Sequence, residues 1–475
     1  MIFTSTIAAI STPPGKGGVA VIRISGSDAL EIAKKIFKPR YEKNIGGFAP
    51  RKQIYGDILC SGEQIDDGLL TYFPAPNSYT GEDVVEISCH GGALITRMVL
   101  ESAFALGAAP AERGEFTKRA FVNGKLSLTE TEAIGMLLDA KSEAQVMISR
   151  EKSRSKLKEA ISKIRELLTS LLGSVYARID YPEEDLGEFS DDEIMDSLKV
   201  IISDVDRLMK TYKTGRAVSE GISTVICGKP NAGKSTLYNL LVGDEAAIVT
   251  DIPGTTRDVL EKNAVLGNVM LKLYDTAGIR SGDVDRVEAI GIERSREKID
   301  SSELILLLFD SQKELEKEDL EILDYVKGSK AEKIAIITKC DFENNENVNN
   351  SSHNRIENIE KHLKKHGFSN VLRISAQSKS EESFKAVSYE IERLFTDEKI
   401  SIGDDAIISS ARQYSSLVRA KEFLKTAIDA FEIGLPTDAS SSDIELALGA
   451  IAELDGRSVT EEIVGDIFAR FCVGK

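Results

Sequence analysis

The spacing of hydrophobic positions changes along the chain, and the first pattern covers residues 1–119. There, short apolar runs alternate with turn-rich segments. Residues 19–25 (VAVIRIS) and 83–88 (DVVEIS) have the composition and length of strands, whereas residues 27–37 have helical spacing behind the N-cap residue Ser27. We therefore expect a mixed α/β domain over residues 1–119.

The second pattern is long, charged and helix-forming, and it begins at about residue 120. Apolar residues that recur every three or four positions predict one helix, which Pro182 should end because proline disfavours a helical residue before it. Ser190 and Glu193 then form a capping box that starts a second helix. The two apolar stripes are Leu157, Ile161, Ile164, Leu168, Leu171 and Val175, and Ile194, Leu198, Ile201, Val205 and Leu208.

The same helical pattern returns from residue 398 to the end of the chain. The simplest arrangement is one helical domain built from residues 120–216 and 398–475, with residues 217–397 inserted between two of its helices. The expected apolar face of the returning part consists of Leu417, Phe423, Leu424, Ala427, Ile428 and Phe431.

Inside the insertion, apolar runs of strand length alternate with helical patterns, as in a doubly wound sheet. We therefore expect an α/β protein in which a Ras-like, doubly wound domain interrupts a helical domain and a mixed α/β domain precedes both. Ligands of such sheets bind beyond the carboxyl ends of the strands, where polar motifs follow here. The runs cover residues 222–227, 270–274, 304–309, 334–337 and 371–374.

The composition is that of an ordinary globular protein, with 475 residues, 42% hydrophobic and 29% charged. The 60 basic and 77 acidic residues give a net charge of −17, so nucleic acid would have to bind a local basic patch or a partner. No apolar run of 18 residues and no secretory signal is present, which predicts a cytosolic protein without membrane spans. The five cysteines are scattered singly and suggest neither a zinc site nor a disulfide framework.

The motif GKPNAGKST, residues 228–236, matches GxxxxGK[ST] between a predicted strand and a predicted helix, which is the order of a P-loop. Its glycines leave room for backbone N–H groups to point at phosphate oxygens, and the helix N-terminus adds partial positive charge. Lys234 would reach the outer phosphates, and Ser235 would ligate Mg²⁺. The predicted phosphate-binding residues are Gly228, Asn231, Ala232, Gly233, Lys234, Ser235 and Thr236.

Two motifs that follow the P-loop predict the magnesium and γ-phosphate contacts. GTTRD, residues 254–258, has the position of a switch I segment, in which Thr256 closes over Mg²⁺. DTAG, residues 275–278, follows a predicted strand, so Asp275 can hold Mg²⁺ through water and the Gly278 N–H can meet the γ-phosphate. The predicted contacts in these motifs are Thr255, Thr256, Asp275, Thr276, Ala277 and Gly278.

Two further motifs predict guanine as the base. In TKCD, residues 338–341, the Asp341 carboxylate can accept both the N1–H and the 2-amino group of guanine, and adenine has neither donor. ISAQ, residues 374–377, adds backbone donors. The predicted base contacts are Thr338, Lys339, Asp341, Ser375 and Ala376. Five motifs in this order indicate GTP binding.

Three other positions bear on chemistry. Ras-like GTPases carry a glutamine after DTAG that orients the attacking water, but this chain has Ile279 there, so another group must do that work or hydrolysis is slow. In the first domain, PPGKGG at residues 13–18 predicts a plain turn. His90 in CHGG is interpreted as a structural hydrogen-bonding residue, and no metal is assigned to it.

At these residues the chain resembles the MnmE (TrmE) family of tRNA-modification GTPases, and the resemblance runs from end to end. It rests on GKPNAGKST, IVTDIPGTTRDV, DTAGIR and VEAIGIERS in the insertion, and on STPPGKGGVAVIRISG, PNSYTGEDVVEISCHGG and RGEFTKRAFVNGKLSLTETEAI before it. IDYPEEDL resembles the helical domain, and the terminal FCVGK resembles the family's Phe-Cys-x-Gly-Lys ending. Thr338 departs from the usual asparagine of the guanine motif, although its hydroxyl can still brace the P-loop.

The resemblance implies how hydrolysis proceeds without a glutamine. In this family a potassium ion supplies positive charge in the transition state, while a glutamate matched by Glu288 orients the water. Two G domains are implied to meet face to face in that state. The implied potassium ligands are Asn231, Thr250, Ile252 and Thr255.

The resemblance also implies an N-terminal domain that forms a homodimer and binds 5-formyl-tetrahydrofolate or a related one-carbon folate. The implied partner is the FAD-dependent MnmG, with which the family adds a 5-carboxymethylaminomethyl or aminomethyl group to the wobble uridine of certain tRNAs. Cys472 lies in the implied modification motif, although a buried small hydrophobe is an equal interpretation. The implied folate contacts are Arg23, Glu86, Lys125 and Lys475.

Two other functions fit parts of the sequence. A regulatory GTPase switch in ribosome assembly, of the Era or Der kind, would share the GTTRD motif, but the chain has no basic KH-like C-terminal domain. A membrane-remodelling stalk of the dynamin kind would need a basic amphipathic or apolar insertion segment, which is absent. FCVGK and PNSYTGED favour tRNA modification.

Overall fold

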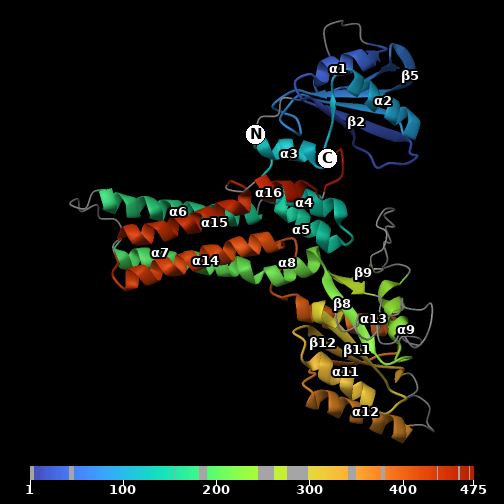
Figure 1. The fold of residues 1–475 in the computed structure, drawn as a ribbon, viewed down its shortest axis with the longest axis vertical. Coiled ribbons are helices and arrows are strands. Elements are labelled where there is room, and N and C mark those ends of the chain that lie inside the picture. The colour runs from blue at the N-terminus through green and yellow to red at the C-terminus, as the bar shows by residue number, and fades with distance from the viewer. Residues whose placement is uncertain are drawn as a thin grey trace. The chain divides into compact units, whose positions relative to one another are not determined.

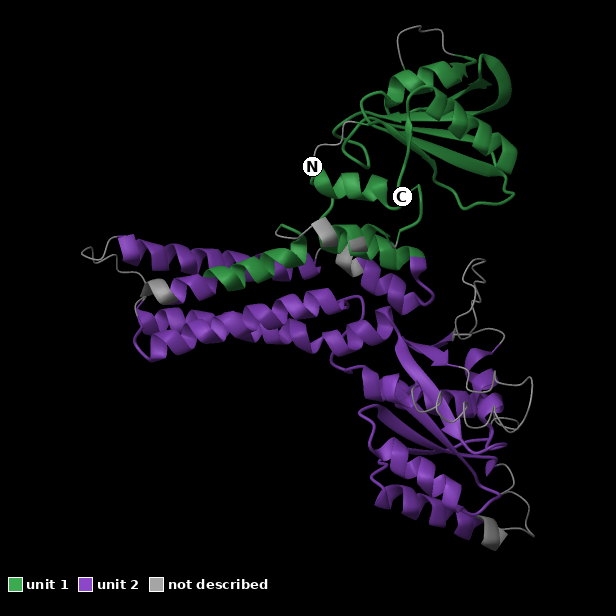
Figure 2. Ribbon diagram, viewed as in Figure 1, with its two compact units in different colours: residues 1–138, 445–475 green, residues 139–444 purple. Residues whose placement is uncertain are grey.

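The computed structural model describes residues 5–41, 48–153, 156–180, 190–243, 261–274, 298–340, 349–375, 380–435, 437–457, 461–469 and 471–474. The chain divides into two compact units. One contains residues 1–138 and 445–475, and the other contains residues 139–444 (Figure 2). The elements of both units are labelled in Figure 1.

A seven-stranded sheet with the order β3-β4-β5-β6-β2-β1-β7 forms the first unit. Its strands are β1 (Ile7–Ile10), β2 (Val19–Ser25), β3 (Phe37–Pro39), β4 (Gln53–Cys60), β5 (Glu63–Phe73), β6 (Val84–His90) and β7 (Ala109–Pro110). All neighbouring strands are antiparallel except β1 and β7. Because side chains alternate between the faces of a strand, Ile22 and Ile24 enter the core while Arg23 lies on the opposite face.

Helices α1 (Ala29–Ile36) and α2 (Ala93–Ala105) cover the apolar face of this sheet (Figure 1). The N-cap of α1 is Asp28 and not the predicted Ser27, and the Asp28 N–H donates to Thr6 Oγ1 over 3.0 Å. A contact with the N-terminal segment therefore fixes where this helix starts. The unit also contains α3 (Glu115–Val122), most of α4 (Leu128–Asp139) and α16 (Glu461–Ala469).

The C-terminal tail docks within the first unit. The Cys472 carbonyl accepts a hydrogen bond from the Gly114 N–H at 3.3 Å, and the Gly474 carbonyl accepts one from Ser11 Oγ at 3.0 Å. Gly474 has φ 95°, and a Cβ there would overlap the carbonyl oxygen of Ile10. Only glycine fits this position without strain.

In the second unit, long helices pack side by side (Figure 1). They are α5 (Glu143–Ser153), α6 (Lys156–Asp180), α7 (Asp191–Lys210), α8 (Tyr212–Ser219) and α14 (Ala411–Glu432), and α15 (Thr437–Asp455) begins in this unit. The stripes predicted for α6 and α7 are buried, and on α14 only Phe423 of the predicted face is half-buried. The predicted capping box is also confirmed, because Ser190 and Glu193 bond reciprocally at the start of α7.

The inserted part of the second unit contains a six-stranded sheet with the order β13-β12-β11-β8-β10-β9. Its strands are β8 (Ile222–Gly228), β9 (Glu261–Leu266), β10 (Val269–Tyr274), β11 (Leu304–Asp310), β12 (Glu332–Thr338) and β13 (Val371–Arg373). All neighbours are parallel except β9 and β10. Residues of α9 (Lys234–Val242) and α13 (Ser380–Phe395) pack on one face, and residues of α11 (Lys317–Lys327) and α12 (Asn349–Lys365) pack on the other. The expected doubly wound fold is confirmed, with an antiparallel edge strand that the sequence did not indicate.

The two ends of the insertion meet along α8. The Ile408 N–H donates to Thr211 Oγ1 at 2.9 Å, and the Asp397 N–H donates to Thr214 Oγ1 at 3.0 Å. Gly215 lies between these contacts, and a Cβ there would overlap the Ile408 carbonyl oxygen. Entry and exit of the inserted sheet are therefore adjacent, as the expected insertion requires. Among the described residues, no helix combines the length and hydropathy that a membrane span requires.

Candidate functional site

The predicted P-loop connects β8 to α9 at the carboxyl end of a central strand. Gly228 and Gly233 have φ values of 145° and 95°, which glycine adopts at little cost, and Asn231 has φ 66°, in the left-handed region that asparagine visits more readily than most residues. At Gly228 a Cβ would also lie 2.6 Å from the Leu308 carbonyl oxygen. Gly233 is the N-cap of α9 and offers no side-chain cap, so the loop ends at a helix N-terminus suited to an anion.

Lys234 lies in the first turn of α9 and points back into the loop. Its Nζ donates to the carbonyl oxygens of Gly228 at 2.6 Å and Lys229 at 2.8 Å. Burial lowers the pKa of Lys234, and among the described residues no carboxylate pairs with it. A half-buried ammonium that donates to two loop carbonyls and has no carboxylate partner among the described residues fits a polyphosphate ligand. Ser235 and Thr236 lie on the same turn, where Ser235 is exposed.

The guanine motif is bonded directly to the P-loop. Thr338 at the end of β12 is buried, and its hydroxyl lies 2.8 Å from the Ala232 carbonyl oxygen and 3.1 Å from that of Phe309. The hydroxyl brace expected from threonine at this position is thus present. The Ser375 N–H, predicted to face the base, donates to Ser383 Oγ of α13 at 3.1 Å.

The structure brings together the P-loop residues and Thr338. Lys339, the residue after Thr338, has φ 60°. Thirteen other residues named in the sequence analysis for the candidate sites lie outside the described part of the chain. They are Thr250, Ile252, Thr255, Thr256, Asp275, Thr276, Ala277, Gly278, Ile279, Glu288, Asp341, Ala376 and Lys475.

The predicted folate residues Arg23 and Glu86 face each other on neighbouring strands β2 and β6. Arg23 Nε and Nη2 lie 2.9 and 2.8 Å from Glu86 Oε1. The guanidinium also lies over two aromatic rings, 5.4 Å from the centroid of Tyr79 and 5.6 Å from that of Phe116. This face of the sheet therefore carries a cation fixed by a carboxylate next to the half-buried ring of Tyr79, whereas Phe116 is fully buried.

Lys125 is linked to this pair through the loop of residues 74–83 between β5 and β6. Its Nζ donates to the Pro76 carbonyl at 3.1 Å, and a Cβ at Gly81 would lie 3.3 Å from Lys125 Cγ. The same loop carries Tyr79, which lies under Arg23. This loop thus joins Lys125 to the Arg23–Glu86 pair.

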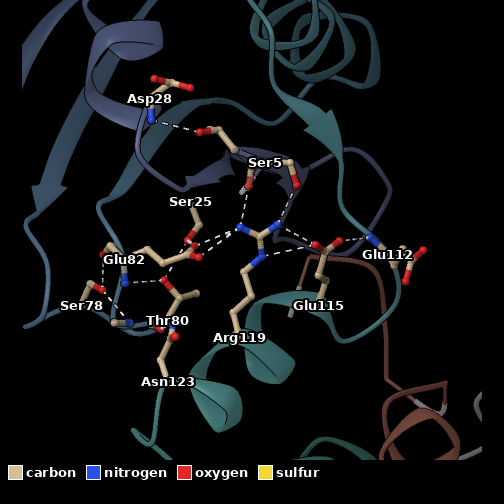
Figure 3. A network of polar contacts seen from close by, with 12 residues as sticks. Ser5, Ser25, Asp28, Ser78, Thr80, Glu82, Glu112, Glu115, Arg119 and Asn123 are labelled. Atoms are coloured by element: carbon tan, nitrogen blue, oxygen red, sulfur yellow. Dashed lines mark hydrogen bonds and ion pairs between the residues drawn. The ribbon is translucent and has the colours of Figure 1, made fainter. Parts of the chain in front are cut away.

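A buried arginine that was not predicted as a site residue anchors this loop (Figure 3). The Arg119 side chain is 0% exposed and pairs with Glu115 at 2.7 Å and Glu82 at 3.1 Å. It also donates to the Ser5 carbonyl at 2.7 Å, while Glu82 accepts from Ser25 Oγ. The spacing of Glu115 and Arg119 on one helix was the available sequence signal. Nothing in the sequence indicated that the pair would be buried.

His90 has the structural role that was expected of it. Its ring Nδ1 lies 2.7 Å from Asp66 Oδ1, and its backbone N–H donates to Asp66 Oδ2 at 2.9 Å. The hydrogen bond and charge of Asp66 raise the pKa of His90. Burial acts to raise the pKa of Asp66, but the hydrogen bonds from His90 outweigh it and lower that pKa.

The cysteines differ sharply in their surroundings. Cys472 is exposed, so its interpretation as a buried hydrophobe is wrong. Cys89 and Cys227 are buried, and burial raises their pKa values to about 11 and about 12. Neither is a nucleophilic thiolate at neutral pH.

Comparison with known proteins agrees with this arrangement along the whole chain. A family model described as the N-terminus of the GTP-binding protein TrmE matches residues 6–125, and one described as the MnmE helical domain matches residues 128–472. Two curated relatives are both named tRNA modification GTPase MnmE. The one from Thermoanaerobacter sp. (strain X514) is 39% identical, and the one from Clostridioides difficile (strain 630) is 37% identical, and each match covers 100% of both chains. The chain belongs to the MnmE family. Because the MnmE relatives are named GTPases, the expected enzyme class, a GTP hydrolase, is confirmed. The alternative function in ribosome assembly is not favoured.

Two solved structures each match part of the chain. A structure of Aquifex aeolicus Era bound to GDP.AlF4- is 20% identical, with 42% of this chain and 66% of that chain covered and a TM-score of 0.29. The G domain of the T. maritima FeoB iron transporter is 24% identical, with 36% and 98% covered and a TM-score of 0.24.

Proposed function

We propose that this chain is a potassium-activated GTPase that works with MnmG to modify the wobble uridine of certain tRNAs. The observation that carries the nucleotide part is the hydrogen bond from Thr338 to Ala232, because it joins a guanine motif to a phosphate-binding loop. The tRNA part rests on the full-length match to proteins named tRNA modification GTPase. The net charge of −17 fits a complex in which the partner supplies much of the basic surface for tRNA.

In the proposed nucleotide site, Lys234 turns from the loop carbonyls to the outer phosphates. Asp341 accepts the hydrogen bonds that guanine alone offers. Ser235 and Thr256 would hold Mg²⁺, with Asp275 acting through water, and the metal would neutralise charge on the phosphate oxygens. Glu288 orients the attacking water in place of the missing glutamine. The proposed potassium ligands are Asn231, Thr250, Ile252 and Thr255.

The K⁺ dependence of turnover tests this mechanism. We expect hydrolysis to be fast in K⁺ and slow in Na⁺, because the ion adds positive charge where the transition state is most negative. Glu288→Ala should bind GTP normally and lose turnover, whereas Glu293→Ala, in the same VEAIGIERS segment, should retain it. Equal rates in both salts, or full activity in Glu288→Ala, would show that the mechanism is wrong.

The tRNA function has a separate test in cells. A strain that lacks the gene should lose the modified wobble uridine in nucleoside analysis of bulk tRNA, and the native chain should restore it. Glu288→Ala should not restore it if modification needs GTP turnover. Retention of the modified nucleoside in the deletion strain would exclude this function.

We also propose a folate site in the first unit, on the sheet face that carries Arg23 and Glu86, and a homodimer formed through this unit. A pteridine ring has a flat face for the half-buried ring of Tyr79 and polar edges for the Arg23–Glu86 pair. Lys125 and Lys475 suit the carboxylates of the glutamate tail. In this proposal the one-carbon donor and the exposed Cys472 belong to the same unit. We also propose that the protein acts in the cytoplasm.

A further inference from the structure

The turn and first helical turn after β11, residues 310–319, contact both halves of the proposed nucleotide site. On the phosphate side, Lys229 of the P-loop pairs with Asp319 at 3.3 Å and with Glu316 at the start of α11. On the base side, Asp310 Oδ2 pairs with Lys339 Nζ at 2.6 Å. Neither contact was indicated by the sequence motifs.

The Asp310 carboxylate is fixed through both of its oxygens. The side chain is only 7% exposed, and while Oδ2 binds Lys339, Oδ1 accepts the Gln312 N–H at 3.0 Å. The next residue, Ser311, binds the guanine motif through its backbone and side chain. Its N–H donates to the Thr338 carbonyl at 3.2 Å, and its Oγ donates to the Lys339 carbonyl at 2.9 Å.

Lys339 needs such support because both its backbone and its side chain are costly to order. Its φ of 60° is uncommon for a residue other than glycine. A free lysine side chain also rotates about several bonds, and binding to a base would have to restrict them. In this structure Asp310 holds the ammonium and Ser311 holds the carbonyl, so the lysine is ordered at both ends by the protein itself.

We propose that Asp310 is a positioning residue for guanine nucleotides, an inference that rests on the proposed GTP site. With Nζ held by Asp310, the four-carbon stem of Lys339 is restrained at its far end within the guanine motif. The stem forms an apolar wall for the face of the purine ring, while the ammonium stays neutralised at its far end. Asp310 acts through Lys339 and does not touch the nucleotide.

The central test is the Asp310→Asn variant, in which the amide oxygen still accepts the Gln312 N–H but no longer carries charge for Lys339. We expect its Kd for a fluorescent GDP analogue to rise about tenfold, the scale of a lost charged hydrogen bond. The same increase should appear in the KM for GTP, with a smaller change in kcat. Glu314→Gln is the matched control, because it removes an exposed carboxylate from the same segment and should bind GDP like the native chain.

A double-mutant cycle shows whether Asp310 acts through the lysine. If it does, Asp310→Asn should have no further effect on GDP binding once Lys339→Ala is present. An equal loss in both backgrounds, a loss in Glu314→Gln of the same size, or GDP affinity in Asp310→Asn within twofold of native would each overturn the inference.

The test separates failure of this inference from failure of the proposed function. A native chain that does not bind GDP would refute the GTP site, and the inference with it. A native chain that binds GDP while Asp310→Asn binds equally well refutes the inference alone. Should Asp310→Asn fail to fold, as judged by thermal unfolding, Ser311→Ala removes the second restraint on Lys339 and should raise the Kd for GDP in the same direction.

Discussion

In the first unit, two basic side chains at the surface, His90 and Arg23, are each held in place by a neighbouring carboxylate. The His90 ring is 65% exposed, yet its partner Asp66 is only 7% exposed and is bonded to both the ring and the backbone of His90. Arg23 is held in a similar way by Glu86 on the next strand. In both pairs, an acidic side chain fixes a basic side chain at the surface of one sheet.

Arg23→Ala should weaken binding of 5-formyl-tetrahydrofolate by about 1 to 3 kcal/mol, the range for losing a hydrogen bond to a charged group. Isothermal titration calorimetry measures this directly. Arg97→Ala removes an arginine that is 66% exposed on α2 and should leave the affinity unchanged. Undiminished binding in Arg23→Ala would remove this residue from the folate site.

The His90–Asp66 pair should make stability depend on pH. The pKa of His90 is raised in the folded state, so its contribution is complete below the unfolded-state pKa of about 6.5 and is lost as pH rises through the raised value. Asp66, with a lowered pKa, keeps its charge down to pH values below the ordinary 3.8. Thermal unfolding should therefore show His90→Gln clearly less stable than the native chain near pH 5.5, with a smaller difference near pH 8.5. A difference that grows with pH would contradict the assigned pair.

At the scale of elements, α3 is anchored by charge as well as by apolar packing. Arg119 lies on its buried face and connects the helix to the N-terminal segment and to the 74–83 loop (Figure 3). Asn123, just past the end of α3, donates to the Thr80 carbonyl of the same loop at 2.8 Å. The position of the proposed folate loop therefore depends on this helix.

Arg119→Met should destabilise the first unit by about 3 to 5 kcal/mol, because it leaves two carboxylates without their shared cation. Hydrogen exchange of peptides from α3 and β6 measures the change. The matched control is Arg97→Ala, which breaks an exposed pair with Glu101 and should cost about 1 kcal/mol or less. Similar protection losses in the two variants would show that the buried network contributes little.

At the scale of the whole molecule, segments far apart in sequence close each unit. In the first unit, Ser11 meets Gly474 and the tail runs beside Arg113. In the second unit, α8 meets the segment that returns from the inserted sheet, with Gly215 against Ile408. The contact along α8 explains how the chain leaves the helical part of the second unit, forms the inserted sheet and returns to the helical part.

Two helix glycines test the closure of the insertion. Gly215→Ala should destabilise the second unit by about 1 to 3 kcal/mol, because the new methyl group overlaps the Ile408 carbonyl. Gly173→Ala in α6, where no atom of the described residues lies within 4 Å of the added Cβ, should stabilise by about 0.5 to 1 kcal/mol. Thermal unfolding of both variants should shift in opposite directions. A stabilised Gly215→Ala variant would show that the segment near Ile408 does not pack as described.

The sequence by itself determined the features that depend on neighbours a few positions apart. The apolar stripes of α6 and α7, the capping box at Ser190 and the strand–loop–helix order of the P-loop are local, because helical and strand periodicity and glycine's backbone freedom act within one element. End-to-end resemblance of short motifs was also enough to identify the family. These predictions needed no knowledge of which elements would pair.

Only the tertiary structure decided the features that join distant segments. The order of the seven-stranded sheet, the burial of Arg119 between Glu82 and Glu115, the pairing of Asp310 with Lys339 and the docking of Gly474 beside Ile10 are contacts of this kind. In the sequence, the charged residues among them, such as Arg119 and Asp310, look like ordinary surface residues. The physical reason is that a charge is stabilised by whatever partner the folded chain brings within a few ångströms, and sequence spacing does not record that partner.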